Sequence, residues 1–290
     1  MSEDLKSAET IIEVKDYSFR YNHSKKLAVE HVSFDIHKGE FLAIIGPTGA
    51  GKTTVCRSIV RLIPEIYPGK SWGDILIGGQ SVTKMAASQI SSFVGYVHQD
   101  AESQILMSNV EKEIAFPLEN LAVPRDEMKV RVERALKLVH LEDYRDRHPY
   151  YLSGGQRQRV VLATALAMDP DVLILDEAVS EIDPLGAEEI TSVAKELNDL
   201  GKTIVFIEHN MEEVAKFADR IVVLDQGHVM ADGSTKDILC DMGLMNQLDL
   251  FPPEVTQVFV ELQKRGIPVE EMPIEVEDAK VKLRKLLGQS

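Results

Sequence analysis

The spacing of hydrophobic and polar residues changes several times along the first 235 residues. From residue 11 to about residue 39, short segments such as 11–14 (IIEV) and 32–36 (VSFDI) alternate apolar and polar side chains between turn residues. This alternation is typical of antiparallel strands. We therefore expect a small antiparallel β layer that leads into the fully apolar run 41–45.

Helical spacing follows that apolar run. Apolar residues at 55, 59, 62 and 63 recur on one helical face until Pro64 interrupts the pattern, which predicts a helix over residues 53–62. Residues 102 to about 152 are also mostly helical in character. We expect an inserted helical subdomain at about 100–165.

Three later runs, at 172–175, 203–207 and 221–224, contain no charge and are rich in β-branched residues. They alternate with helical segments, which is typical of a parallel sheet covered by helices on both faces. Asp225, Gln226 and Gly227 then predict a hairpin turn. The predicted core is therefore α/β.

The character of the chain changes again near residue 235. The breaker sequence Phe-Pro-Pro at 251–253 precedes two amphipathic segments, 254–264 and 276–287, with Gly266 and Pro268 between them. We expect a main domain at 1–235 and a small C-terminal extension at 236–290. The apolar faces of the extension pack either on its own domain or on another subunit, and the pattern leaves both open.

Composition narrows the possible partners. The 290 residues, 44% hydrophobic and 27% charged, suffice for one large core and a smaller unit. The net charge of −15 opposes binding to nucleic acid. No apolar stretch approaches the roughly 18 residues of a membrane span, so we expect a cytosolic protein that can still dock on a membrane protein. Cys56 and Cys240 are expected to be small core residues.

Residues 46–53 read Gly-Pro-Thr-Gly-Ala-Gly-Lys-Thr and directly follow the apolar run 41–45. A glycine-rich turn between a strand and a helix is a phosphate-binding P-loop, because its backbone N–H groups converge on an anion. Lys52 would reach the β- and γ-phosphates, and the Thr53 hydroxyl would ligate Mg²⁺. The predicted nucleotide-binding residues of this segment are Gly46, Pro47, Thr48, Gly49, Ala50, Gly51, Lys52, Thr53 and Thr54.

Two carboxylates, Asp176 and Glu177, stand at the end of the apolar run 172–175. The carboxyl ends of parallel strands are where such sheets bind ligands. Asp176 would coordinate Mg²⁺ through its water shell, and Glu177 would act as the general base on the attacking water.

A second glycine turn, Leu-Ser-Gly-Gly-Gln at 152–156, precedes a helical segment. The Ser153 hydroxyl and the neighbouring backbone N–H groups could bind an anion at the positive end of the helix. Taken alone, the same sequence is more often an ordinary helix N-cap.

The order of these motifs, with Gln99 and His209 each following a strand, resembles the ATP-binding cassette (ABC) ATPases over about residues 11–235. The resemblance implies a P-loop NTPase core with an antiparallel β subdomain and an inserted helical subdomain. It implies that Tyr21 stacks on adenine, with Tyr17 the weaker candidate. Gln99 would sense Mg²⁺ or water and report to a membrane partner, and His209 would hydrogen-bond the γ-phosphate.

The same resemblance implies an ATP-sandwich dimer. Ser153 and Gly155 would contact the γ-phosphate held by the opposing subunit, and Asp183 would lie in the loop that crosses the interface. Gly154 and Gln156 complete this nucleotide-binding turn. Two departures from the family occur: Ala178-Val179 replace the usual Pro-Thr, and Glu181 brings a charge into the interface loop. Every group required for hydrolysis is present.

Segments 102–105, 110–116 and 251–257 look like the energy-coupling factor (ECF) and cobalt-transport ATPases. This implies a motor subunit at the cytoplasmic face of the cell membrane, paired with itself or with a related ATPase. Its partners would be a membrane scaffold subunit and a substrate-binding membrane subunit, and its cargo a vitamin or a transition-metal ion. Glu102, Glu111 and Glu113 would suit basic side chains of the scaffold, although a solvated acidic face fits them equally.

Two alternatives remain open. The chain could be the ATPase of another ABC transporter class, or a soluble ABC protein with no transport role. The soluble ABC proteins usually carry a long coiled-coil insertion or two cassettes, and this sequence has neither. The resemblance implies that specificity for the transported molecule resides in the membrane components.

Overall fold

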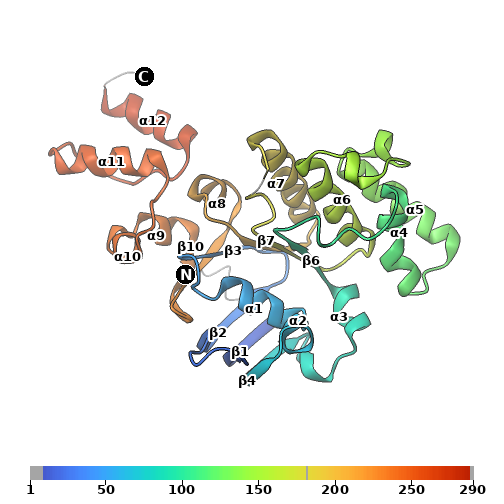
Figure 1. The fold of residues 1–290 in the computed structure, drawn as a ribbon. Helices are drawn as coiled ribbons and strands as arrows, with labels where there is room; N and C mark the ends of the chain where they lie inside the picture. Colours follow the sequence, from blue (N-terminus) through green and yellow to red (C-terminus); the bar gives the residue numbers. More distant parts are fainter. Residues whose placement is uncertain (1–8, 181, 288–290) are drawn as a thin grey trace.

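The computed structural model describes residues 9–180 and 182–287, which form two sheets with helices packed around them (Figure 1). The antiparallel sheet has the order β2-β1-β4-β5. Its strands are β1 (Thr10–Tyr21), β2 (Val29–His37), β4 (Gly69–Ile77) and β5 (Gln80–Ser81). This sheet is the β layer that the alternating N-terminal segments predicted.

The second sheet has the order β10-β9-β3-β8-β7-β6 and is parallel except for β10, which pairs antiparallel with β9. Its strands are β3 (Phe41–Ile45), β6 (Val94–His98), β7 (Val172–Asp176), β8 (Thr203–Ile207), β9 (Arg220–Asp225) and β10 (His228–Ser234). Strands β3, β7 and β8 are buried along their whole length because helices cover both faces of the sheet.

Helices of the core lie on both sides of this sheet. They are α1 (Lys52–Ile59), α2 (Leu62–Glu65), α3 (Ala87–Phe93), α7 (Pro184–Asp199) and α8 (Met211–Phe217). The helix predicted over residues 53–62 is wrong at its C-terminal end, since α1 stops at Ile59. Arg61 adopts a left-handed conformation (φ +60°) and Ile63 an extended one, which turns the chain before Pro64 and keeps the Ile63 side chain in the core.

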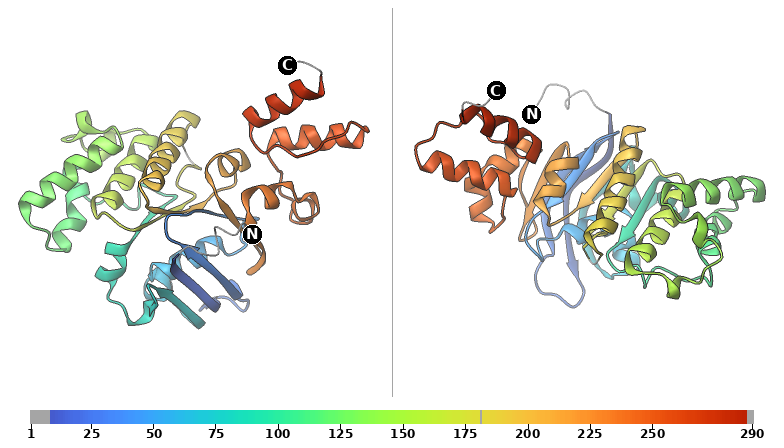
Figure 2. Two further views of the ribbon diagram at one scale, coloured as in Figure 1. Left: turned by 180° about the vertical axis from the view of Figure 1, so that it is seen from behind. Right: turned by 90° about the horizontal axis from the view of Figure 1, so that it is seen from above.

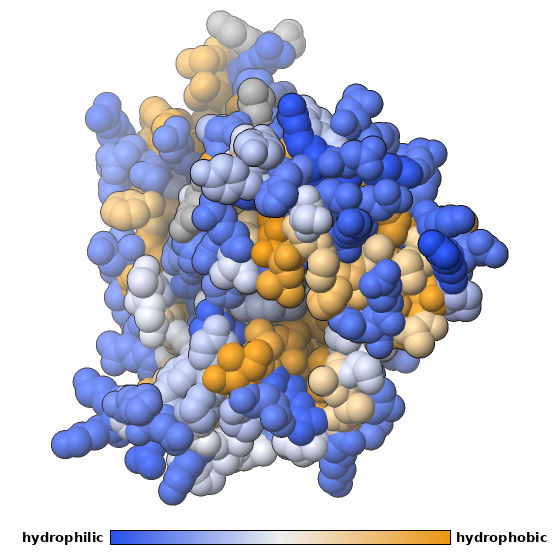
Figure 3. Space-filling view, turned by 45° about the vertical axis from the view of Figure 1, so that its right-hand side comes forward, coloured by the Kyte–Doolittle hydropathy of each residue, from blue (hydrophilic) through white to orange (hydrophobic). Residues whose placement is uncertain are grey.

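The helical subdomain contains α4 (Val110–Asn120), α5 (Arg125–Leu138) and α6 (Gly154–Ala167). Its apolar faces join the core cluster that also contains Leu173 and Phe206 of the parallel sheet. Figure 3 shows apolar side chains gathered around a hollow on the face where this subdomain comes forward. Exposed apolar residues elsewhere on the surface include Ile66 after α2 and Leu106 before α4.

The C-terminal extension lies at the end of the molecule opposite the helical subdomain (Figure 2). Its first two helices, α9 (Thr235–Cys240) and α10 (Met242–Gln247), pack through Leu239 and Met245 against Val214 and Val223 of the core. Helices α11 (Glu254–Lys264) and α12 (Val276–Leu286) project further and leave Val258, Val281 and Leu287 exposed. The extension therefore packs on its own domain at its start and presents an uncovered apolar face at its end.

The sequence also predicted that both cysteines are buried and that no segment is long and apolar enough to span a membrane. Cys56 is fully buried, as expected, and burial raises the pKa of its thiol well above the ordinary value. Cys240 is only half-buried, because α9 lies at the edge of the core, so its assignment as a core residue was wrong. Within the described ranges, every helix is too short or too polar to span a bilayer.

Candidate nucleotide and metal site

The P-loop connects β3 to α1 and is fitted tightly between two other segments. Gly46 has a φ of +143°, and a Cβ there would lie 1.9 Å from the Leu224 carbonyl oxygen. Gly51 has a φ of +105°, and a Cβ there would lie 2.7 Å from Cγ1 of Val29. Only glycine fits these two positions, because any side chain would collide with β9 or β2.

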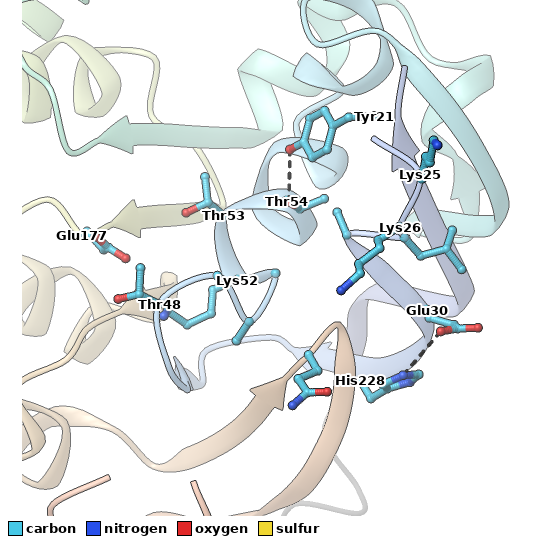
Figure 4. Close-up of a pocket in the computed structure, with 16 residues that line it drawn as sticks. Tyr21, Lys25, Lys26, Glu30, Thr48, Lys52, Thr53, Thr54, Glu177 and His228 are labelled. Atoms are coloured by element: carbon cyan, nitrogen blue, oxygen red, sulfur yellow. Dashed lines mark hydrogen bonds and ion pairs between the residues drawn. The ribbon is translucent and has the colours of Figure 1, made fainter. Parts of the chain in front are cut away.

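Lys52 is held inside this loop. Its ammonium donates hydrogen bonds to the carbonyl oxygens of Gly46 (2.8 Å) and Pro47 (3.2 Å). The residue is buried, and desolvation lowers its pKa while the carboxylates of Glu177 and Asp176 oppose that shift. The P-loop thus fixes a cation beside the pocket that it encloses (Figure 4).

Thr53 and Asp176 meet at the same edge of the sheet. The Thr53 hydroxyl donates to Oδ1 of Asp176 at 2.9 Å. This pair supplies two oxygen ligands of the kind that Mg²⁺ prefers. Across the residues that the structure describes, three or more His, Cys, Asp or Glu side chains never gather to form a metal cage. The donor set fits an ion that takes its remaining ligands from water and phosphate, as protein-bound Mg²⁺ usually does.

Glu177 and His209 also come together. Glu177 has a left-handed backbone (φ +53°), and its N–H donates to the Ile207 carbonyl at 3.1 Å. Its Oε1 lies 3.0 Å from Nε2 of His209. The neighbouring Glu208 is buried and accepts the N–H of His209 at 2.8 Å. The ends of β7 and β8 therefore place the predicted general base against the predicted γ-phosphate ligand.

Lys52, Thr53 and Glu177 border a pocket of about 1040 Å³. Tyr21 lines it, and its hydroxyl lies 3.1 Å from Oγ1 of Thr54. Tyr17, the weaker candidate for the adenine contact, is buried in the core instead. Glu177 closes the wall near the P-loop.

Several residues of the pocket wall were missed from the sequence. Lys25 and Lys26 border the pocket from the loop between β1 and β2, and Gln226 and His228 border it from the β9–β10 turn. His228 pairs with Glu30, Nε2 to Oε2, at 3.5 Å, as Figure 4 shows. Exposed lysines and hairpin residues carry no local motif, so only the three-dimensional arrangement reveals them.

Tyr96 on β6 was missed as well. Its hydroxyl donates to Oδ2 of Asp176 at 2.6 Å. Burial raises the pKa of Tyr96 far above its ordinary value, and the charge of Asp176 adds to the shift, so the phenol stays protonated. The only signal in the sequence was an aromatic residue with a polar hydroxyl three positions before Gln99. Gln99 follows β6 directly and is half-buried.

The Ser153 turn lies apart from this pocket and begins α6. Ser153 is exposed, and its Oγ accepts the Gln156 N–H at 3.2 Å while Gln156 Oε1 accepts the Ser153 N–H at 2.9 Å. This reciprocal arrangement is a capping box, which agrees with the N-cap interpretation of the sequence. Gly154 is exposed beside it, whereas Gly155 is buried.

Asp183 forms the corresponding cap of α7, accepting the Gly186 N–H at 3.1 Å. A Cβ on Gly155 would lie 3.8 Å from Oδ2 of Asp183, so the two turns are neighbours. Glu181, the charge predicted in this loop, lies outside the described residues. The structure thus forms two groups of predicted site residues: one around the P-loop pocket and one around the Ser153 turn.

The acidic residues predicted to face a membrane partner behave differently from one another. Glu102 is exposed and pairs with Arg157 at 2.8 Å, and Glu111 is half-exposed beside Arg145 at 3.7 Å. The expectation for Glu113 was wrong, because its side chain is buried. Glu113 Oε2 accepts the N–H groups of Leu106 (2.8 Å) and Met107 (2.6 Å), so it holds the preceding loop from inside.

Comparison with known proteins gives consistent matches. The family profile described as ABC transporter matches residues 29–180. A putative ABC transporter ATP-binding protein of Pyrococcus horikoshii is 42% identical over 258 residues, which cover 89% of this chain and 91% of that protein. The energy-coupling factor transporter ATP-binding protein EcfA1 of Geobacillus kaustophilus is 38% identical over 264 residues, with 90% and 92% coverage.

The fold matches solved structures as well. The structure of cbiO1 from Clostridium perfringens, described as part of the ABC transporter complex cbiONQ, superimposes with a TM-score of 0.72. The two sequences are 27% identical, and the alignment covers 88% of this chain and 99% of that one.

Proposed function

The chain belongs to the ATP-binding subunits of the ABC transporter family, which hydrolyse ATP to power transport, and from that premise we propose that it is the motor of an ECF-type importer. The likeness to EcfA1 and to cbiO1 supports this class. The proposed cargo is a micronutrient, either a vitamin or a transition-metal ion. The proposed location is the cytoplasmic face of the cell membrane.

Within the pocket, each residue receives a distinct role. Lys52 and the P-loop N–H groups of residues 48–53 would hold the phosphates, and Tyr21 would stack on the base. Glu177 would take the proton of the attacking water, which it can do because its carboxylate stands at the pocket wall. His209, now 3.0 Å from that carboxylate, would hold the general base in place and contact the γ-phosphate.

Magnesium is the proposed metal, with Thr53 and Asp176 as its protein-side ligands and Gln99 as the residue that senses it. When bound, it would neutralise charge between the β- and γ-phosphates. The hydrogen bond between the Thr53 hydroxyl and Asp176 Oδ1 supports this assignment, because it places the carboxylate beside the Thr53 hydroxyl, where it would reach the water shell of the metal.

The observation that carries the dimer proposal is the separation of the two groups of site residues. The pocket is bordered by the P-loop, the β1–β2 loop, Glu177 and the β9–β10 turn, whereas Ser153 is exposed at the start of α6. The capping box satisfies the N–H groups of Ser153 and Gln156, and an incoming anion would approach the N-terminal end of α6 at the exposed Gly154. We propose that a second ATPase subunit, identical or related, supplies its ATP to this turn, with Asp183 at the same interface.

Closure of such a dimer depends on the γ-phosphate, because that group would bridge Lys52 of one subunit and Ser153 of the other. Nucleotide then binds the closed state more tightly than the open one, as any population shift requires. Hydrolysis removes the bridge, and the subunits separate. This cycle is the proposed source of movement in the membrane subunits.

The membrane scaffold is proposed to contact the hollow between the helical subdomain and the core (Figure 3). Leu106, exposed just before α4 of the helical subdomain, would offer apolar contact, and Glu102 and Glu111 would offer negative charge to basic side chains. Each carboxylate already has an arginine partner, so a scaffold cation would have to compete for it.

The division of the chain is proposed in a modified form. The cassette was predicted to span residues 1–235, with the helical subdomain inserted at about 100–165, but α9 and α10 complete the core cluster around Val214 and Val223. We propose that the unit that folds as one piece extends to Leu250, and that α11 and α12 form the extension that pairs with another subunit.

Affinity purification of the tagged chain from solubilised membranes tests the proposed class. An ECF-type motor should bring down a polytopic scaffold together with a substrate-binding membrane protein. A conventional ABC transporter ATPase would bring down its own permease without a separable substrate-binding membrane subunit. Recovery of ribosomal or DNA-repair proteins in place of any membrane protein would contradict the transport role.

A further inference from the structure

Asp176 is fixed by two hydrogen bonds, one to each carboxylate oxygen. Oδ1 accepts the Thr53 hydroxyl at 2.9 Å, and Oδ2 accepts the Tyr96 hydroxyl at 2.6 Å. The carboxylate is almost completely buried, so water cannot easily replace either donor. The oxygen that faces away from Thr53 therefore depends on the phenol for its partner.

Strand pairing sets the position of this phenol. β6 runs parallel to β7, with Tyr96 opposite Ile174 and His98 opposite Asp176. The Tyr96 side chain thus lies two residue pairs behind Asp176, and its hydroxyl reaches forward to the carboxylate. A phenylalanine would fill the same space on β6 but could not make this bond.

Arg57 of α1 holds the phenol from the other side. Its guanidinium interacts with the Tyr96 side chain, lies 4.4 Å from the centre of the Tyr67 ring, and places Nη2 2.6 Å from Nε2 of His98. The phenol proton is directed to Asp176, and the guanidinium charge lies beside the phenol. Helix α1 therefore supports both ligands of the proposed metal, Thr53 directly and Asp176 through Arg57 and Tyr96.

We propose that Tyr96 is a positioning residue that orients Asp176 for the magnesium–nucleotide complex. The inference rests on the metal role proposed for Asp176 and adds the residue on which that role depends. Groups that orient a metal ligand typically change metal affinity by about 10- to 100-fold when they are removed. The hydroxyl of Tyr96 matters here, because the ring alone would serve packing.

The experiment compares Tyr96→Phe with the wild type and with Tyr67→Phe, a matched control that removes a hydroxyl from the same cluster without touching Asp176. ATP binding is titrated with and without Mg²⁺, and Mn²⁺ binding to the ATP-loaded protein is followed by electron paramagnetic resonance. For Tyr96→Phe we expect metal-free ATP affinity within twofold of the wild type and an apparent Mn²⁺ affinity about tenfold weaker. Tyr67→Phe should leave both unchanged.

The variant Asp176→Asn tests the metal role of Asp176 separately from the positioning role of Tyr96. If Asp176→Asn leaves the metal response unchanged, the proposed ligand is wrong and the inference falls with it. If Asp176→Asn weakens Mn²⁺ binding but Tyr96→Phe does not, only the inference is overturned. An equal loss of metal-free and metal-dependent ATP binding in Tyr96→Phe would also overturn it, since that result marks a purely structural role.

Discussion

At the scale of single residues, Glu177 and His209 show how the strand ends assemble the reaction site. Their side chains come from two neighbouring strands and meet at 3.0 Å beside the P-loop pocket. Changing Glu177→Gln keeps the shape but removes the basic oxygen. We expect steady-state ATP hydrolysis to fall by a factor on the order of 10² to 10⁴, with ATP affinity nearly unchanged.

Phosphate release and equilibrium ATP titration measure these two quantities. The exposed α7 variant Glu196→Gln is the matched control and should hydrolyse ATP like the wild type. Near-normal phosphate release from Glu177→Gln would remove Glu177 from the role of general base.

Glu208 predicts a pH dependence of stability. Desolvation by burial raises its pKa, and the charge of Glu213 adds to the shift, although the N–H groups of Asn210 and His209 oppose it. Its Oε2 and that of Glu213 are buried without a hydrogen-bond partner. Because the folded pKa is raised, the protonated form is favoured in the folded state, and stability is lost as pH rises from the unfolded pKa through the folded pKa.

Glu208→Gln should remove this loss while keeping an oxygen that accepts the two N–H groups. At pH 7 we expect the variant to be more stable by about 1 kcal/mol, or roughly 2–4 °C in Tm. The difference should shrink as the pH falls toward the ordinary pKa of a carboxyl group. Thermal unfolding between pH 5 and pH 8 tests this, and a difference that stays constant with pH would show that the carboxylate is not the cause.

Residue identity was predictable where a motif fixes the chemistry. Lys52 lies inside the P-loop and Thr53 contacts Asp176, as the motif spacing predicted, while their roles toward phosphate and metal stay predictions. Tyr96 was not predictable in this way. A tyrosine within a strand is read as a packing residue, and its contact with Asp176 depends on the pairing of two strands about 80 residues apart.

At the scale of elements, the P-loop is shaped by its contacts with β9 and β2 as much as by its own sequence. Gly46 and Gly49 both have positive φ, but only Gly46 lies against another backbone. Gly46→Ala would place a Cβ 1.9 Å from the Leu224 carbonyl, so β9 or the loop must move. Gly49→Ala meets nothing within 4 Å and carries only the cost of a left-handed backbone, about 1 kcal/mol.

We therefore expect Gly46→Ala to lower Tm by more than Gly49→Ala and to weaken ATP binding at least tenfold, since the displaced loop can no longer hold Lys52. Differential scanning calorimetry and ATP titration compare the pair. Equal effects of the two variants would show that backbone conformation, and not contact with β9, sets the shape of the loop.

Element boundaries were less predictable than element types. The strands at 172–176 and 203–207 and the helix at 254–264 lie where their patterns indicated, because burial and amphipathic spacing are local signals. The end of α1 was not visible in the sequence. Ile63 continues the helical spacing, but its side chain reaches the core from an extended backbone after Arg61 turns the chain.

At the scale of the whole molecule, two features are proposed to contact a second subunit. They are the separation of the two groups of site residues and the projecting helices α11 and α12. The fold class followed from the sequence because motif order and strand pattern agreed. The packing of the extension did not follow from the sequence, because its apolar faces were compatible with packing on its own domain or on another subunit. In the structure, α9 and α10 pack on the core, whereas Val258, Val281 and Leu287 remain exposed.

The last prediction separates the two contributions to dimerisation. Glu177→Gln, which blocks turnover, is prepared as the full chain and as a chain ending at Leu250. We expect light scattering in saturating Mg-ATP to show a dimer of the full chain, and the shortened chain to need a higher concentration for the same dimer fraction. A chain ending at Gly233 is unsuitable, because it would strip Leu239 and Met245 from the core and confuse dimer loss with unfolding.

Each outcome bears on a different contact. If α11 and α12 only cover their own cassette, the shortened chain should lose thermal stability without losing dimer, which would contradict their proposed pairing role. If neither chain dimerises in Mg-ATP, even with its co-purifying subunits present, the exposed Ser153 turn does not receive a second subunit's nucleotide.

Gly155→Glu in the full chain, which brings a negative charge beside the proposed γ-phosphate position, should abolish the nucleotide-dependent dimer because like charges repel there.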